Sequence, residues 1–198
     1  MTQKHLFSIF DVTKQVFYST PLSIGIVNLK PLLPGHVLII PKRVVPRLSD
    51  LNSPEITDLF LTVQKVGKGL ERYYNAQALT ISLQDGKSAG QSVPHVHVHI
   101  LPRHSTDFEG ENDRIYPLLE ENESHLKENL EISQDQNDST MTNGNINNQL
   151  KKTKGKANSI GEDWNIPSDE DRKPRSMQEM EDEARAFAKY FKSIEATQ

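Results

Sequence analysis

The stretch His95-Val96-His97-Val98-His99 places three histidines at alternate positions of one short segment. Such alternation predicts a β-strand, over residues 93–101, because successive side chains of a strand point to opposite faces. The three imidazoles would then share one face, about 6.6 Å apart between neighbouring Cα atoms, and the row would span about 13 Å. The proline at position 102 is expected to end this strand.

The segments around this stretch predict an α+β fold with a five-stranded, mainly antiparallel sheet and two main helices. The β-prone runs are residues 16–18, 23–28, 36–40, 78–84 and 93–101. A connection rich in proline and glycine, residues 30–35, joins the second and third runs. A connection of this kind favours an antiparallel pair.

A helix is predicted between the third and fourth strands. Ser53 is its expected N-cap, Pro54 suits its first turn, and Asn75 is its expected end. Its apolar face consists of residues at helical spacing, namely Ile56, Leu59, Phe60, Val63, Val66 and Leu70. Gly67 and Gly69 weaken the second half, so a close contact with a neighbouring element is expected there.

The 198 residues divide into two parts by composition. Residues 1–120 hold 12 of the 23 basic and 11 of the 27 acidic residues, and they predict one folded domain. Residues 121–163, rich in Asn, Gln and charged side chains, predict a disordered low-complexity insert in which weak helical order could persist as far as residue 130. Residues 164–198 predict a C-terminal segment whose helix covers about 177–193.

The C-terminal helix is predicted from a capping box formed by Ser176 and Glu179. Its apolar face consists of Met177, Met180, Ala184, Phe187 and Phe191. An amphipathic helix gains most of its stability by burying such a face. We therefore expect it to dock on the domain or on a partner subunit.

The composition excludes several classes of site. The chain has no cysteine, which excludes disulfides, thiolate zinc sites and cysteine nucleophiles. It has no run of about 20 apolar residues, and its net charge of −4 gives no electrostatic footprint for nucleic acid. We expect a cytoplasmic protein, with the nucleus as an alternative location, and with neither a membrane nor a nucleic acid as partner.

The histidine row admits three interpretations. A His-x-His pair can ligate zinc, although the outer histidines lie far apart for one tetrahedral ion and no cysteine completes the set. The row could also be a polar sheet surface without a reaction. In the third interpretation, a neutral imidazole attacks a phosphate while its neighbours donate protons. The loop Gly86–Ser92 favours this one, because its glycines let backbone N–H groups approach anionic oxygens.

The sequence resembles the fragile-histidine-triad branch of the histidine-triad family over about residues 5–120 and again from Trp164 to Phe191. The motifs that carry the resemblance are His95 to Ile100, Asn28 to Pro31, Pro34 to Leu38, Gln84 to Gly86, Ala89 to Val93, Leu101 to Arg103, Asp107-Phe108 and Asp113 to Tyr116. The resemblance implies a diadenosine polyphosphate hydrolase, preferring diadenosine triphosphate and releasing AMP and ADP. It also implies Mg²⁺ or Mn²⁺ on the substrate and a homodimer with a ten-stranded sheet.

The resemblance also implies roles for individual residues. His97 would be the nucleophile that becomes adenylylated, His99 would assist the leaving group, and His95 and His36 would orient the row. Substrate contacts would come from Asn28, which would hold a ribose hydroxyl, and from Gln84, Gly90, Gln91, Ser92, Val93 and His99. No residue is expected to be a resident metal ligand.

Two positions depart from the pattern of this branch, and two alternative functions remain open. The branch often has Pro-Glu where this chain has Lys87-Ser88, so the lysine could alter the preferred phosphate chain length. Ile9 stands where members of the branch can place a substrate-contacting histidine. The alternatives are a nucleotide phosphoramidase and a nucleotide-binding signalling protein whose substrate complex is the active species.

Overall fold

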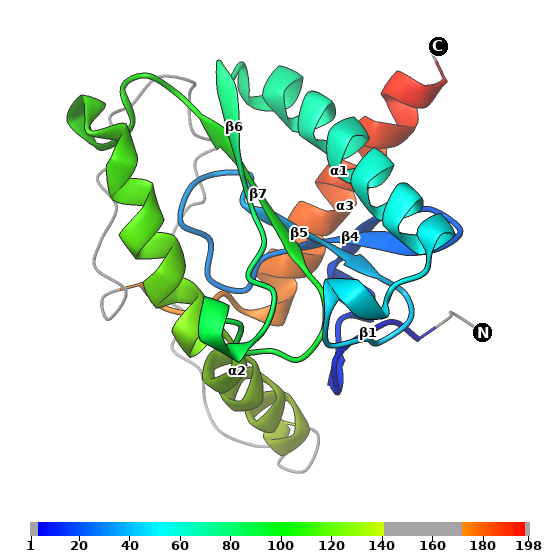
Figure 1. Ribbon diagram of the computed structural model, residues 1–198. Helices are drawn as coiled ribbons and strands as arrows, with labels where there is room; N and C mark the ends of the chain where they lie inside the picture. The colour runs from blue at the N-terminus through cyan, green and yellow to red at the C-terminus, as the bar shows by residue number, and fades with distance from the viewer. Residues whose placement is uncertain (1–3, 141–171, 197–198) are drawn as a thin grey trace.

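The computed structural model describes residues 4–140 and 172–196. Its centre is a five-stranded antiparallel sheet in the order β3-β4-β5-β7-β6 (Figure 1). The strands are β3 (Val16–Ser19), β4 (Ser23–Val27), β5 (Val37–Pro41), β7 (Val98–Arg103) and β6 (Ala78–Ser82). A small hairpin of β1 (Leu6–Phe7) and β2 (Phe10–Asp11) precedes them. This architecture confirms the predicted α+β fold and its antiparallel sheet.

Three helices cover the sheet: α1 (Ser53–Tyr74), α2 (Ile115–Thr140) and α3 (Met177–Glu195). Figure 1 shows α1 and α3 together on one side, whereas α2 runs along the other side. Four residues that are in register across neighbouring strands share one face of the sheet, namely Ile26, Leu38, His99 and Ser82. This face lies under α2 and carries the histidine site. Among the described residues, no helix is long and apolar enough to span a membrane.

The histidine strand begins later than the sequence predicts. β7 starts at Val98, so His99 lies in the sheet while His95 and His97 precede it. Pro94 explains the difference, because it has no N–H to donate and is confined to strand ends and edges. β5 pairs with β7 only as far as Val98, and upstream of it the N–H of Val96 bonds to the carbonyl of Val45 instead. The predicted start of this strand at residue 93 is therefore wrong.

The helix α1 covers nearly the predicted range, but its N-cap is Asn52 rather than Ser53. The Asn52 side chain accepts a bond from the N–H of Glu55, whose carboxylate accepts one from Asn52 N–H in return. Asn75 ends the helix in a left-handed conformation, as predicted. Two members of the predicted buried face, Ile56 and Phe60, are 36% and 43% exposed.

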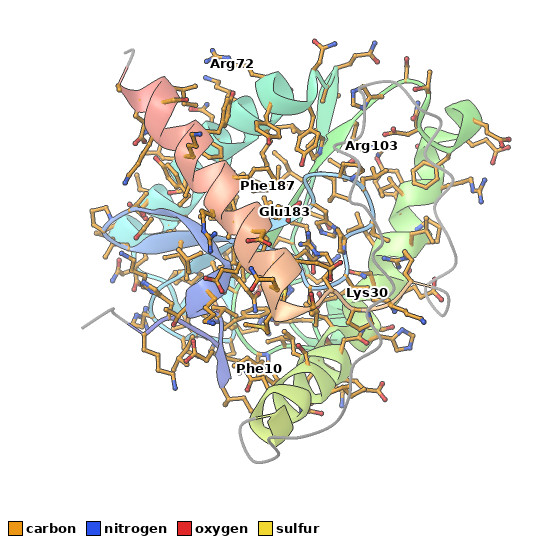
Figure 2. The ribbon with its side chains drawn as sticks, turned by 180° about the vertical axis from the view of Figure 1, so that it is seen from behind. Phe10, Lys30, Arg72, Arg103, Glu183 and Phe187 are labelled. Atoms are coloured by element: carbon orange, nitrogen blue, oxygen red, sulfur yellow. The ribbon has the colours of Figure 1, made fainter. Side chains whose placement is uncertain are left out.

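The helix α3 docks on the domain through Met180, Ala184, Phe187 and Phe191, all of which are buried. Figure 2 shows α3 lying across the back of the molecule, with Phe187 on its course. The predicted close contact at the α1 glycines is present. A Cβ on Gly69 would overlap the ring of Phe191, and one on Gly67 would lie 2.6 Å from Leu79 Cδ1.

The domain boundary predicted at residue 120 is wrong, because α2 runs through it from Ile115 to Thr140. Residues 121–140 are therefore helical rather than a disordered insert. The physical reason is a buried face: Leu119, Leu126 and Leu130 lie at helical spacing and are at most 5% exposed. The rest of the predicted insert, residues 141–163, lies outside the described residues, as does Trp164.

Candidate active site

The three histidines of the row are fully buried and lie together. The rings of His97 and His99 have centroids 5.2 Å apart, and Phe7 of the N-terminal hairpin contacts both His95 and His97. The predicted row therefore forms, although most of it lies in an extended segment before β7. The hairpin that covers it leaves Ile9 75% exposed.

Backbone groups fix the protons on His95 and His97. The N–H of Ser8 donates to Nδ1 of His95 at 2.9 Å, so Nε2 of that ring carries a proton and donates it to the Pro41 carbonyl. Nδ1 of His97 lies 2.7 Å from the His95 carbonyl oxygen, which can only accept. Nδ1 of His97 is therefore protonated, and its Nε2 is the nitrogen left for chemistry.

A second chain of bonds fixes His99 through His36. The N–H of Leu32 donates to Nδ1 of His36 at 3.2 Å, which puts the proton of a neutral His36 ring on Nε2. That Nε2 lies 2.9 Å from Nδ1 of His99, so it donates there. The proton of a neutral His99 ring is then on Nε2, directed into the site as a donor. His36 thus holds the ring of His99 in place.

The burial of these rings keeps three of the four histidines neutral. Desolvation lowers the pKa of His36 well below its ordinary value, and His99 and the nearby Arg172 lower it further. Desolvation also lowers the pKa of His99. Burial lowers the pKa of His95 to about 4. Neutral rings are required for the tautomers that the backbone bonds select.

His95 is expected to stay neutral through the physiological pH range and to titrate near pH 4. Because its pKa is lowered on folding, its contribution to stability is present above about pH 6.5 and is lost as pH falls toward 4. The loss is about 2 kcal/mol between pH 7 and pH 5. NMR titration of the His95 ring measures its pKa in the folded protein, and a midpoint near pH 6.5 would contradict the prediction.

A residue outside the predicted site, Glu123 of α2, lies against the histidines. One carboxylate oxygen, Oε2, is 3.0 Å from Nε2 of His97 and 3.4 Å from Nε2 of His99. The other, Oε1, accepts bonds from the backbone N–H of Ser92 at 2.9 Å and from its hydroxyl at 3.2 Å. All three side chains of the His97–Glu123–His99 cluster are fully buried.

His97 and Glu123 form a buried ion pair. Burial alone would lower the pKa of His97, but the Glu123 carboxylate outweighs it and holds that pKa above its ordinary value. Burial alone would raise the pKa of Glu123, but the imidazoles of His97 and His99 outweigh it and hold that pKa far below its ordinary value. A buried carboxylate of this kind needs such partners to remain charged.

The other predicted substrate residues lie around this cluster with different partners. Asn28 is buried, and its Nδ2 lies 3.2 Å from Nδ1 of His36. Gln91 fixes its own loop, because it accepts from Gly86 N–H and donates to the carbonyls of Pro46 and His95. The side chain of Val93 belongs to the hydrophobic core, which leaves only its backbone for a substrate contact.

A cleft of about 240 Å³ opens beside Glu123. Gln84, Gly90 and Ser82 line it from the sheet and the glycine loop, while Tyr116, Leu119 and Glu120 line it from α2. Gly90 has a φ of +92°, a conformation that suits glycine, so a side chain there would strain the loop. The cleft connects the predicted phosphate loop to the buried cluster.

His97, His99 and Glu123 are also the described residues that could hold a metal ion, since their ligand atoms lie within 4.8 Å of one another. Two imidazoles and one carboxylate are a donor set for zinc rather than for Mg²⁺, which prefers oxygen ligands in octahedral geometry.

Glu123 could have been found from the sequence. It lies four residues after Leu119 and three before Leu126, on the buried face of a helix. A glutamate in the middle of an apolar face is rarely buried without a partner. A second residue, Arg175, connects α3 to the site. It lies just before α3, donates to the carbonyl of Asn28 and pairs with Glu183 at 2.6 Å. No pattern in the sequence indicates this contact.

The family model described as HIT domain matches residues 10–106. An asymmetrical bis(5'-nucleosyl)-tetraphosphatase of Schizosaccharomyces pombe is 48% identical over 191 residues, 96% of each chain. A bifunctional bis(5'-adenosyl)-triphosphatase/adenylylsulfatase of Arabidopsis thaliana is 55% identical over 65% of this chain and 71% of that protein.

Among solved structures, the diadenosine triphosphate hydrolase of Plasmodium falciparum, in complex with Cyclomarin A, superposes with a TM-score of 0.60. It is 26% identical, and the match covers 98% of this chain and 87% of that one. The full-length likeness to the Schizosaccharomyces pombe protein shows the family directly. The chain belongs to the HIT domain family.

Proposed function

We propose that this protein hydrolyses dinucleoside polyphosphates, cleaving diadenosine triphosphate to AMP and ADP. The observation that carries the proposal is the convergence of four groups on one point, which Glu123 now occupies. These groups are Nε2 of His97, the Nε2–H of His99, and the N–H and hydroxyl of Ser92. A nucleophilic nitrogen beside three donors suits attack on a phosphorus whose oxygens the donors hold.

The roles follow from the tautomers. The lone pair of His97 Nε2 forms a bond to the α-phosphorus, and the bond from that phosphorus to the leaving ADP oxygen breaks. The Nε2–H of His99 is directed to donate to the leaving oxygen, because Nδ1 is held by His36. Water then attacks the same phosphorus and returns a proton to His99, which releases AMP and restores the His97 lone pair.

The names of the relatives support dinucleoside polyphosphate hydrolysis, but they differ in the number of phosphates in the substrate. The relative that matches over nearly the whole length is named a tetraphosphatase, while the Arabidopsis relative is named a triphosphatase. Lys87, at the edge of the phosphate loop, is exposed and free to meet a longer chain of phosphates. We favour the triphosphate as substrate, with Mg²⁺ or Mn²⁺ on its phosphates.

The substrate prediction is tested by product analysis with diadenosine tri-, tetra- and pentaphosphate, and with adenosine phosphoramidate, in ¹⁸O-labelled water. We expect the triphosphate to be cleaved fastest, with the label in AMP and none in ADP, since water attacks the adenylyl phosphorus. Faster hydrolysis of the phosphoramidate would support the rival activity. Absence of hydrolysis on the whole panel would contradict an enzyme of this class.

We further propose a homodimer with a continuous ten-stranded sheet. The outermost strand β6 and the neighbouring helix α1 support it, because they expose apolar side chains that a partner could bury. These are Ile56, Phe60 and Leu61 of α1 and Ile81 of β6. A cytoplasmic or nuclear location stays a prediction from the cysteine-free sequence.

A further inference from the structure

We propose that α2 is a built-in competitive inhibitor, whose Glu123 carboxylate occupies the phosphate position at His97 until the substrate displaces it. The proposal rests on the proposed function, since it needs a phosphate that competes for the same place. It gives a role to a buried acidic residue that the hydrolytic mechanism does not use.

The Glu123 carboxylate is placed as a phosphoryl group would be. Each of its oxygens lies beside donors that would serve a phosphoryl group. Oε2 accepts from Nε2 of His97 and lies 3.4 Å from Nε2 of His99, a buried nitrogen without a hydrogen-bond partner among the described residues, and Oε1 accepts from the N–H and hydroxyl of Ser92. Backbone N–H groups near a glycine loop commonly bind anionic oxygens. Glu123 is thus bound as an oxyanion, in the manner expected of the substrate.

The closed arrangement, with Glu123 against His97, also blocks the nucleophile. Nδ1 of His97 is committed to the His95 carbonyl, so Nε2 is the nitrogen that must reach phosphorus. Glu123 lies 3.0 Å from that atom, and neither side chain is exposed. A phosphorus atom and this carboxylate cannot occupy the same position. Substrate attack therefore requires that the Glu123 carboxylate leave this position, a departure that we assign to a movement of α2.

Departure of Glu123 also prepares His97 for chemistry. The carboxylate is what holds the pKa of His97 above its ordinary value against the opposing effect of burial. Without it, burial favours the neutral ring, whose Nε2 lone pair is the nucleophile. The departure of Glu123 thus uncovers Nε2 of His97, and it also removes the charge that keeps this nitrogen protonated.

The helix α2 also carries the charge of a competitor. Its buried apolar residues are Ile115, Leu119, Leu126 and Leu130, and the Asn122 side chain donates to the Lys30 carbonyl at 3.0 Å. Figure 2 shows Lys30 near the beginning of α3 and Phe10 beside the far part of α2. Residues 115–134 hold five acidic residues and one lysine, so an arriving polyphosphate repels the helix.

A zinc site made of His97, His99 and Glu123 is the main rival, and the contacts favour the oxyanion mimic over it. Zinc would be bound by donors of lone pairs, yet Nε2 of His99 carries its proton because Nδ1 accepts from His36. The second carboxylate oxygen is held by Ser92, which supplies hydrogens rather than lone pairs to it. A proton-relay role for Glu123 would require it to stay in the site during attack.

The test compares Glu123→Gln with Glu121→Gln, a matched change at an exposed position of the same helix. Loss of the anionic competitor is expected to lower the KM for diadenosine triphosphate about tenfold, with kcat within about twofold, because a larger fraction of the protein is open. Glu121→Gln is expected to leave both constants unchanged. Asn122→Ala, which loosens α2 without touching the carboxylate, should lower KM in the same direction.

Binding of AMP, measured by calorimetry, separates this proposal from the proposed function. If AMP binds Glu123→Gln about tenfold tighter than wild type, the inhibitor role holds even where no hydrolysis is found. Amide hydrogen exchange in residues 115–134 is expected to rise when wild type is saturated with AMP. A fall in kcat, an unchanged AMP affinity, or stoichiometric zinc in wild type that Glu123→Gln lacks would overturn the proposal.

Discussion

Replacing His97 with asparagine is expected to lower the turnover of diadenosine triphosphate by about 10⁴-fold or more. Asparagine can keep a hydrogen bond to the His95 carbonyl, but its amide nitrogen has no lone pair able to attack phosphorus. The loss should appear in kcat, because the covalent step itself is removed. AMP binding is expected to persist, because Ser92 and His99 still hold the phosphate.

The matched control is His104→Asn, the same substitution at a histidine outside the row. His104 lies beyond β7, and its Nε2 contacts the Tyr74 carbonyl rather than the site. Its variant is expected to turn over substrate at the wild-type rate. Mass spectrometry of rapidly quenched protein should find the adenylyl group on wild type and not on His97→Asn. Wild-type turnover by His97→Asn would refute His97 as the nucleophile.

The parts of the fold that sequence predicts well are those with local causes. The helix α1 ends at Asn75, as predicted, and α3 begins with the predicted capping box of Ser176 and Glu179. Both features depend on groups only a few residues apart. The N-cap of α1 is one residue earlier than predicted because Asn52 and Ser53 are both good caps. The choice of Asn52 follows from its reciprocal bonds with Glu55, which also pairs with Arg43 at 2.6 Å.

The site is only partly predictable for the opposite reason. The row of histidines can be read from the sequence, but the direction of each ring depends on distant backbone groups. The N–H of Ser8 and the carbonyl of Pro41 lie 87 and 54 positions away from His95, and they select its tautomer. No spacing in the sequence encodes such contacts.

The prediction of a disordered insert over residues 121–163 rests on composition, and it is wrong for residues 121–140. Residues 121–140 are polar enough to suggest disorder, and α2 contains few apolar residues. Its first half is nevertheless held on the domain by an ion pair, by the bond from Asn122 to the Lys30 carbonyl and by four buried apolar residues, Ile115, Leu119, Leu126 and Leu130. The ion pair joins Glu123 to His97, which lies 26 positions earlier, and a compositional window does not include both.

Phe187→Ala is expected to lower the free energy of unfolding by about 3–5 kcal/mol, a large part of the stability of a domain of this size. Phe187 is 1% exposed, and its ring lies 5.3 Å from Phe17 of β3 and 5.4 Å from Tyr73 of α1. The cavity left by alanine would therefore loosen α3 from the sheet and from α1 together. Urea unfolding measures the change.

Lys189→Ala, an exposed change two residues further along α3, is expected to shift the unfolding free energy by no more than about 0.5 kcal/mol. A loss below about 1 kcal/mol in Phe187→Ala would show that α3 contributes little to the fold. The site should respond as well, because Arg175 before α3 donates to the Asn28 carbonyl, and Asn28 lies against His36. Loosening α3 therefore weakens the support of His36, and through it the Nε2–H of His99 that the leaving group needs.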